Sequence, residues 1–190
     1  MVTGELSPAT ASGSAVRLIG GEMLSGSDTG PEDTARFGAW LLALLGDAVP
    51  RAGRVLLAGT HGTELVEALT ARGLVADLVL RSLPDARATR VQLAATGVRV
   101  LCGGLDRLPS DDTVGGYDAV LALDGVDRLC GPDSPPHGWT DMVALLAGLA
   151  RPGGLLAVLV DNGLGMRRLT VAEPDPATSA APGRVTPPTG

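Results

Sequence analysis

Residues 54–69 read RVLLAGTHGTELVEAL, and this stretch decides the fold. It opens with an aliphatic run at 55–58, passes through a turn of small residues that contains Gly59 and Gly62, and continues with apolar residues at helical spacing. A strand that is apolar on both faces and leads directly into a helix is the repeating unit of a parallel sheet covered by helices. The stretch therefore predicts one strand–turn–helix unit.

The same unit recurs along the chain. Aliphatic runs at 55–58, 76–80, 98–102, 117–123 and 155–160 alternate with helical segments at 64–71, 85–95 and 140–150. An amphipathic helix is also predicted over 33–49, where apolar residues are spaced one helical turn apart and Pro50 follows. This alternation indicates an α/β fold, a doubly wound parallel sheet of about five strands.

The composition indicates an acidic protein with an aliphatic core. The 190 residues carry 15 basic side chains, all Arg, against 21 acidic ones, and only 2% of residues are aromatic. Nucleic-acid binding is not expected, because a positive groove and stacking rings are both lacking. No membrane span is expected either, because the longest apolar runs fall far short of the ~20 residues that a spanning helix needs. Two cysteines and no visible secretory signal favour a cytoplasmic location.

The ends of the chain differ in composition from its middle. Residues 1–30 are rich in Gly, Ser, Thr and Ala without sustained periodicity, and residues 171–190 are dominated by Pro, Ala and Thr. Such compositions bury too little apolar surface to offset the entropy of ordering the chain. We therefore expect disordered tails at 1–30 and 171–190 around one α/β domain at 31–170.

The turn after the first strand of the series is the best candidate for a ligand site. Ligands of open parallel sheets bind at the carboxyl ends of the strands, and Gly59 and Gly62 can adopt backbone angles closed to other residues. A tight turn without any ligand explains the glycines equally well. The turn is not a nucleotide-binding P-loop, because the chain has no Lys. A dinucleotide-binding G-x-G-x-x-G is also disfavoured, because no glycine stands at 61 or 64.

Four segments resemble the motifs of class I S-adenosylmethionine-dependent methyltransferases, in the family's order. They are RVLLAGTHGTELVEAL at 54–69, VRVLCGGLDRLP at 98–109, YDAVLALDGVDRL at 117–129 and LARPGGLLAVLVDN at 149–162. The resemblance implies a Rossmann-like methyltransferase fold and S-adenosyl-L-methionine as cofactor. The family continues past the fifth strand with a final antiparallel strand pair, which is missing from this Pro-rich C-terminus.

The resemblance also implies which residues contact the cofactor, although several depart from the family's pattern. Leu57, Arg81 and Gly104 stand where the family commonly has acidic residues, and Asp106 could substitute for the last of these. Arg81 cannot accept a hydrogen bond from a ribose hydroxyl, because guanidinium only donates. The implied cofactor-binding residues are Gly59, Thr60, His61, Gly62, Arg81, Ser82, Asp106, Ala122 and Leu123.

The remaining polar residues suggest no metal site. Cys102 and Cys130 lack metal-ligand spacing, and His137 has no Cys or carboxylate at ligand spacing. His61 is either a polar loop residue or a general base. The loop at 131–138 is either a lid or a passive connector.

Two functions follow from these observations. The first is a methyltransferase that acts on an O or N nucleophile of a small molecule, with no catalytic base identified. The alternative is a non-catalytic, truncated methyltransferase-like module that binds a protein partner or forms a homodimer through the open sheet edge beside the fifth strand.

Overall fold

The computed structural model describes residues 15–28 and 40–160. The chain divides into two compact units, Met1–Val160 and Asp161–Gly190, and all described residues belong to the first. Its strands are β1 (Arg17–Gly20), β2 (Gly53–Ala58), β3 (Leu74–Leu80), β4 (Arg99–Gly103), β5 (Tyr117–Ala122) and β6 (Ala150–Val158). The α-helices are α2 (Trp40–Leu45), α3 (Thr63–Ala71), α4 (Leu83–Gln92), α5 (Ser110–Thr113) and α6 (Trp139–Leu149), and short 3₁₀ turns are η1 (Gly46–Ala48) and η2 (Leu105–Arg107).

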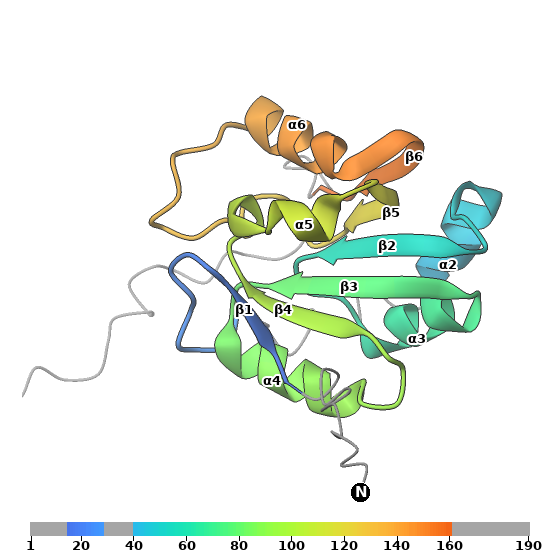
Figure 1. The fold of residues 1–190 in the computed structure, drawn as a ribbon, viewed down its shortest axis with the longest axis horizontal. Helices are drawn as coiled ribbons and strands as arrows, with labels where there is room; N and C mark the ends of the chain where they lie inside the picture. Colours follow the sequence, from blue (N-terminus) through green and yellow to red (C-terminus); the bar gives the residue numbers. More distant parts are fainter. Residues whose placement is uncertain (1–14, 29–39, 161–190) are drawn as a thin grey trace, which may run out of the picture. The chain divides into compact units, whose positions relative to one another are not determined.

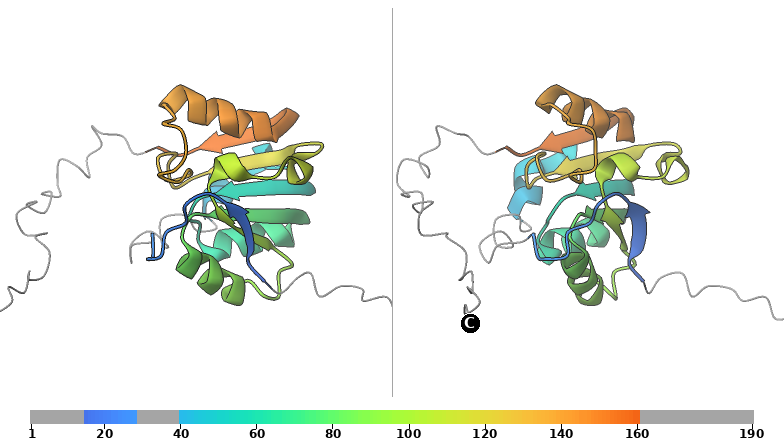
Figure 2. Two further views of the ribbon diagram at one scale, coloured as in Figure 1. Left: turned by 60° about the vertical axis from the view of Figure 1, so that its left-hand side comes forward. Right: turned by 90° about the vertical axis from the view of Figure 1, so that its left-hand side faces the viewer.

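The six strands form one sheet in the order β1-β4-β3-β2-β5-β6, and every strand pair in it is parallel (Figure 1). From β4 to β6 this is the Rossmann-like order, in which the chain first steps away from the central strand to one side and then to the other. Figure 2 shows β6 with α6 at one end of the sheet and α4 at the other, where β1 is the edge strand beside β4. The predicted doubly wound α/β fold is confirmed.

The sheet is covered on both faces by apolar side chains. One core cluster joins the sheet to α2, α3 and α4 through Leu41, Leu65 and Ala86 respectively. The other joins it to α6 and η2 through residues such as Leu146 and Leu105. Strands buried on both faces need uninterrupted apolar sequence, which is why the aliphatic runs located β2 to β5 correctly; the run at 155–160 located the half-buried C-terminal part of β6. No helix in the described ranges is long and apolar enough to cross a lipid bilayer.

The sixth strand lies where the sequence predicted a disordered tail. Residues 1–30 were assigned to a tail and about five strands were expected, yet Arg17–Gly20 form β1 beside β4. Leu18 pairs with Cys102, and the Arg17 guanidinium forms a 2.9 Å ion pair with Asp112. Because β1 is short and mostly exposed, its sequence carries no alternating apolar pattern that would reveal it.

Other predicted segments fall outside the described residues. These are the first part of the helix expected over 33–49, of which α2 covers Trp40–Leu45, and the Pro-rich tail at 171–190. The absence of the final antiparallel strand pair, which the sequence also predicts for this C-terminal region, likewise concerns residues outside the described ranges. The Trp40 side chain, one of the apolar residues that define the helix expected over 33–49, is 55% exposed.

A buried ionic cluster ties the strands together near the amino-terminal ends of β2, β4 and β5. Asp77 of β3 is 1% exposed and accepts hydrogen bonds from Arg99, Arg54 and Tyr117. Arg99 also reaches Asp112 at 3.0 Å, and the Arg54 guanidinium lies 4.6 Å from the centre of the Tyr117 ring. Because these groups lie away from the carboxyl ends of the strands, the cluster stabilises the sheet rather than binding a ligand there.

Candidate functional site

The candidate site lies at the point where the strand order reverses, between β2 and β5. The chain leaves β2 toward β3 on one side and leaves β5 toward β6 on the other, and open α/β sheets bind ligands at the carboxyl ends of such strands. Gly59 follows β2 with a φ of +92°, and its N–H donates to the Val79 carbonyl at 3.0 Å. A side chain here would be strained, and its Cβ would lie 3.2 Å from Leu129.

Gly62 caps a helix and does not adopt the glycine-specific backbone angles that the sequence predicts for it. Its φ is −63°, an angle that any residue adopts, so the expectation of an unusual backbone at this glycine is wrong. Gly62 is the N-cap of α3, and its carbonyl accepts hydrogen bonds from the amides of Leu65 and Val66. Only Gly59 therefore requires glycine for its conformation.

His61 is a buried histidine rather than a polar loop residue. Its side chain is 5% exposed, and burial lowers its pKa to about 4 despite a 2.9 Å hydrogen bond between Nδ1 and the Gly59 carbonyl. Because a carbonyl oxygen only accepts, Nδ1 carries the proton and the ring is neutral. The other nitrogen, Nε2, is shielded from solvent and has no partner among the described residues.

Arg81 and Ser82 hold an N-terminal segment across the carboxyl end of β3. The Arg81 guanidinium forms a 3.2 Å ion pair with Asp28 and donates to the Cys130 carbonyl at 3.2 Å. The Ser82 hydroxyl donates to the Gly26 carbonyl at 2.9 Å and accepts from the Asp85 amide, which caps α4. These contacts place residues 24–28 over the edge of the sheet where a ligand would bind.

The space that remains at the turn is small. A cavity of about 10 Å³, enough for one water molecule, is lined by Asp28, Gly59, Thr60, Leu80, Arg81, Ser82, Asp85, Asp124 and Arg128. Four predicted cofactor contacts, Gly59, Thr60, Arg81 and Ser82, therefore meet at one cavity. The paired Arg81 and Asp28 side chains, 18% and 21% exposed, both line this cavity.

The other predicted contacts lie elsewhere. Ala122 and Leu123 are buried members of the two core clusters, with exposed fractions of 0% and 3%. Asp106 lies in η2, where its Oδ1 accepts a 3.0 Å hydrogen bond from the Ser134 hydroxyl. None of these three residues lines the small cavity.

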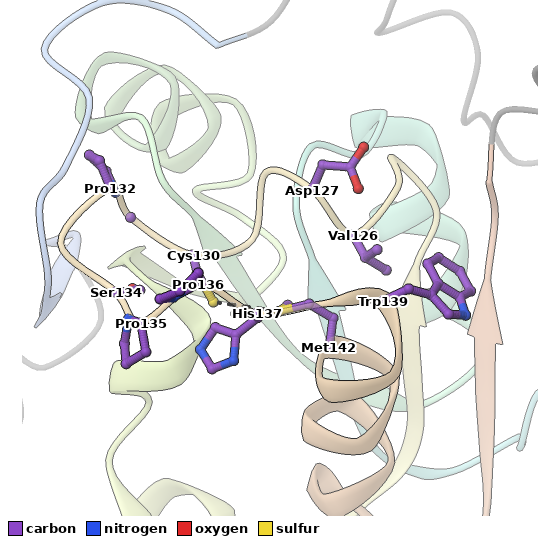
Figure 3. A pocket seen from close by; sticks show the side chains of 11 residues that line it. Val126, Asp127, Cys130, Pro132, Ser134, Pro135, Pro136, His137, Trp139 and Met142 are labelled. Atoms are coloured by element: carbon purple, nitrogen blue, oxygen red, sulfur yellow. Dashed lines mark hydrogen bonds between the residues drawn. The ribbon is translucent and has the colours of Figure 1, made fainter.

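A larger cavity of about 430 Å³ lies beside the loop that follows β5 (Figure 3). Its lining consists of Val126, Asp127, Cys130, Gly131, Pro132, Ser134, Pro135, Pro136, His137, Trp139 and Met142. The loop at 131–138, predicted as a lid or a connector, thus forms a wall of the cavity, and α6 supplies Trp139 and Met142. The cavity could not be predicted from the sequence, because no sequence pattern indicates that a Pro-rich loop and the first turn of the following helix enclose a cavity.

Cys130 is a protonated thiol at neutral pH. Burial raises the pKa of Cys130, and the negative charge of Asp106 raises it further. Its sulfur lies 3.8 Å from that of Met142, an interaction drawn as a dashed line in Figure 3. A thiol held neutral in this way is not activated as a nucleophile.

No protein-family model and no curated protein matches the chain. Among solved structures, the chain is similar to an S-adenosylmethionine-dependent methyltransferase from Geobacter sulfurreducens, determined in complex with S-adenosyl-L-homocysteine. The TM-score is 0.49 and the sequence identity is 19%. The matched region covers 64% of this chain and 47% of that one, so the similarity spans about half of the methyltransferase's length.

Proposed function

We propose that this domain binds S-adenosyl-L-methionine at the turn after β2 and transfers the methyl group to an O or N nucleophile of a small molecule. The observation that carries the proposal is the position of Gly59: a glycine at φ +92° at the reversal point of a Rossmann-ordered sheet. The four methyltransferase-like sequence segments support the same cofactor. When bound, the cofactor supplies an electrophilic methyl group, and its departure leaves S-adenosyl-L-homocysteine.

The polar groups at the turn suit this cofactor chemically. The first amides of α3 are donors for a carboxylate, and Thr60 offers a hydroxyl. Asp28 supplies an acceptor for ribose hydroxyls, the function that position 81 lacks. Most of the rate enhancement would come from positioning the two reactants.

The space at the turn sets a condition for this function. A cavity of about 10 Å³ cannot hold a nucleoside, so the Arg81–Asp28 ion pair must separate before the cofactor enters. The Arg81 and Asp28 side chains are 18% and 21% exposed, so the pair is largely buried, and separating it costs at least the ~1 kcal/mol typical of surface pairs. Binding of the ligand must supply this energy.

The experiment is titration calorimetry with S-adenosylmethionine and S-adenosylhomocysteine, supported by thermal shift. Gly59→Ala strains the turn and crowds Leu129, and we expect it to abolish binding. Gly97→Ala is the matched control, because Gly97 also has a positive φ of +72° but has open space around it. Wild-type protein that gives neither heat nor a thermal shift at millimolar ligand would contradict the proposal, as would equal binding by both variants.

A second function, a non-catalytic module that binds a protein partner, is favoured by the same closed turn. Among the described strands, β6 pairs only with β5, which leaves its other edge as a possible pairing surface. Light scattering separates the two functions. A monomer that binds cofactor contradicts the non-catalytic module, and a stable oligomer that binds neither nucleoside contradicts the methyltransferase.

A further inference from the structure

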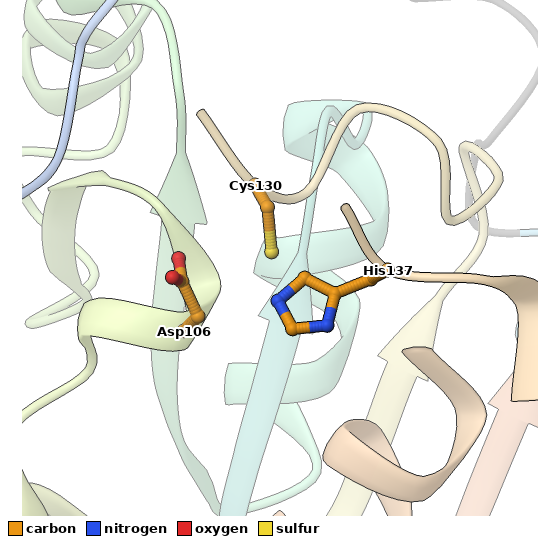
Figure 4. A group of neighbouring side chains, drawn as sticks. All are labelled: Asp106, Cys130 and His137. Carbon is orange, nitrogen blue, oxygen red and sulfur yellow. The ribbon is translucent and has the colours of Figure 1, made fainter. Parts of the chain in front are cut away.

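Three metal-ligand side chains from different parts of the chain converge beside the larger cavity. Asp106 comes from η2 after β4, Cys130 from the loop after β5, and His137 from the residues just before α6. One potential ligand atom from each lies within 4.8 Å of the other two (Figure 4). Figure 4 shows all three side chains pointing into the same space, with one His137 ring nitrogen facing Asp106.

The surroundings hold two of these side chains in place. The Ser134 hydroxyl donates to Asp106 Oδ1 at 3.0 Å, and Gly104 leaves room for that oxygen, since a Cβ there would lie only 2.6 Å from it. The Cys130 backbone is held by Arg81, which donates to its carbonyl at 3.2 Å. Hydrogen bonds that orient a ligating carboxylate are a regular feature of metal sites in proteins.

His137 carries the observation that points to a missing ligand. Its Nε2 atom is shielded from solvent and has no hydrogen-bond partner among the described residues. Buried polar atoms are nearly always paired, so an unpaired nitrogen next to a thiol and a carboxylate requires an explanation. A bound cation would supply the missing partner.

A Cys–His–Asp nucleophilic triad is the main alternative, and the arrangement argues against it. In such a triad the histidine stands between the nucleophile and the carboxylate. Here the Cys130 sulfur and an Asp106 oxygen themselves lie within 4.8 Å of each other. All three groups meet at one point, which is the arrangement of a coordination sphere.

We propose that Asp106, Cys130 and His137 bind one Zn²⁺ ion. Thiolate, imidazole and carboxylate together are donors that zinc accepts, whereas Mg²⁺ and Ca²⁺ prefer oxygen alone. Ligand atoms around tetrahedral zinc are roughly 3.3 to 3.8 Å apart, from metal–ligand distances of about 2.0 to 2.3 Å. The three side chains reach this geometry by shifts of about 1 Å, and zinc displaces the thiol proton on binding.

Three protein ligands leave one position of the tetrahedron for water or another small ligand. Cys130 and His137 also line the cavity of about 430 Å³, so the fourth ligand would enter from that side. Sites with three protein ligands and an open position are typical of catalytic rather than structural zinc. This inference does not depend on the proposed methyltransferase function, because it uses a different cavity.

The test is metal binding by the full chain, kept reduced with a phosphine. We expect one Zn²⁺ per chain by calorimetry and by metal analysis after gel filtration. Co²⁺ as a probe should give the near-ultraviolet thiolate-to-cobalt charge-transfer band. Cys130→Ser should abolish that band, and Asp106→Asn and His137→Ala should each weaken zinc binding at least tenfold.

The matched control is Cys102→Ala, which removes the other thiol, buried in the core and outside the cluster. It should keep both the band and the affinity. Circular dichroism confirms that each variant is folded, and His137→Ala, in a surface loop, replaces Cys130→Ser if the latter unfolds. Three results would overturn the proposal: no zinc bound by the wild type, zinc binding unchanged in all cluster variants, or loss of the cobalt band in Cys102→Ala.

Discussion

The Asp77 carboxylate accepts two hydrogen bonds of 2.6 Å from the Arg99 guanidinium, so that β3 and β4 are joined by a bidentate ion pair. Asp77 is 1% exposed, and Arg54 and Tyr117 donate to the same oxygen, Oδ2. Burial alone would raise the pKa of Asp77, but the bonds and charge of Arg99, with those from Tyr117 and Arg54, hold it below its usual value. Asp77 is therefore ionised at neutral pH.

Removing this carboxylate should destabilise the fold. We expect Asp77→Ala to lower the free energy of unfolding by about 3 kcal/mol, because it leaves buried donors and a positive charge without a partner. Arg99 is 43% exposed, so water relieves part of this cost. Urea denaturation measures the effect. Asp47→Ala is the control, since its ion pair with Arg51 is on the surface, and it should change stability little. If both substitutions lowered the free energy of unfolding by the same amount, the buried cluster would stabilise the fold no more than a surface ion pair does.

Acid should destabilise the protein through His61. The folded pKa of about 4 lies below the ordinary 6.5, so the unfolded state binds the proton first and stability falls as pH drops from 6.5 toward 4. Between pH 7 and pH 5 the loss amounts to about 2 kcal/mol. His61→Asn should remove this part of the pH dependence in urea denaturation. Asp77 does not interfere, because its ordinary pKa of 3.8 confines its contribution to lower pH. An unchanged slope in the variant would contradict the assignment.

Tyr117, the only tyrosine, should resist ionisation while the protein is folded. Burial and then the charge and hydrogen bond of Asp77 raise its pKa above the ordinary 10.0. In an alkaline titration, tyrosinate absorbance should appear only together with the loss of circular dichroism. Tyrosinate formed near pH 10 in folded protein would show that the Tyr117–Asp77 bond is absent in solution.

Removing the Arg81–Asp28 ion pair should strengthen binding of the proposed cofactor. If this pair closes the site, Arg81→Ser lowers the dissociation constant for S-adenosylmethionine at least about fivefold, because separating the pair costs roughly 1 kcal/mol or more. Arg128→Ser is the control, because Arg128 lines the same cavity but donates to the main-chain carbonyl of Asp28 rather than to its carboxylate. Calorimetry compares the two variants with the wild type. Weaker binding by Arg81→Ser would assign Arg81 to cofactor binding rather than to closure.

The sequence predicted the strands with continuous aliphatic runs and missed the short exposed strand β1 and the contacts made by loops. The runs located β2 to β5 because burial on both sides imposes that composition, and a run of partly buried residues located the edge strand β6. β1 was missed because a short, exposed edge strand requires no such apolar composition. Asp112 stands in a short polar stretch whose sequence gives no sign of burial, yet it is 8% exposed and pairs with Arg17 and Arg99. Long-range pairing of charges leaves no local signal in the chain.

The candidate sites were predictable to different degrees. The turn at Gly59 was found because a glycine after a buried strand is a local pattern. The grouping of Asp106, Cys130 and His137 could not be found, because the separations between them match no metal-binding motif and depend on how two loops fold against each other. The ion pair between Asp28 and Arg81 could not be predicted either, because it joins residues 53 positions apart and depends on how the N-terminal segment folds over the sheet.

The position of β1 has a consequence for how the protein is made on the ribosome. Arg17 is synthesised early, but its ion-pair partner Asp112 follows 95 positions later, and β1 has no strand to pair with until β4 has emerged. Contacts so distant in sequence form late, after the cost of closing the intervening loop has been met. We expect β2 and β3 to associate first, and the N-terminal segment to remain open to nascent-chain chaperones until β4 is available.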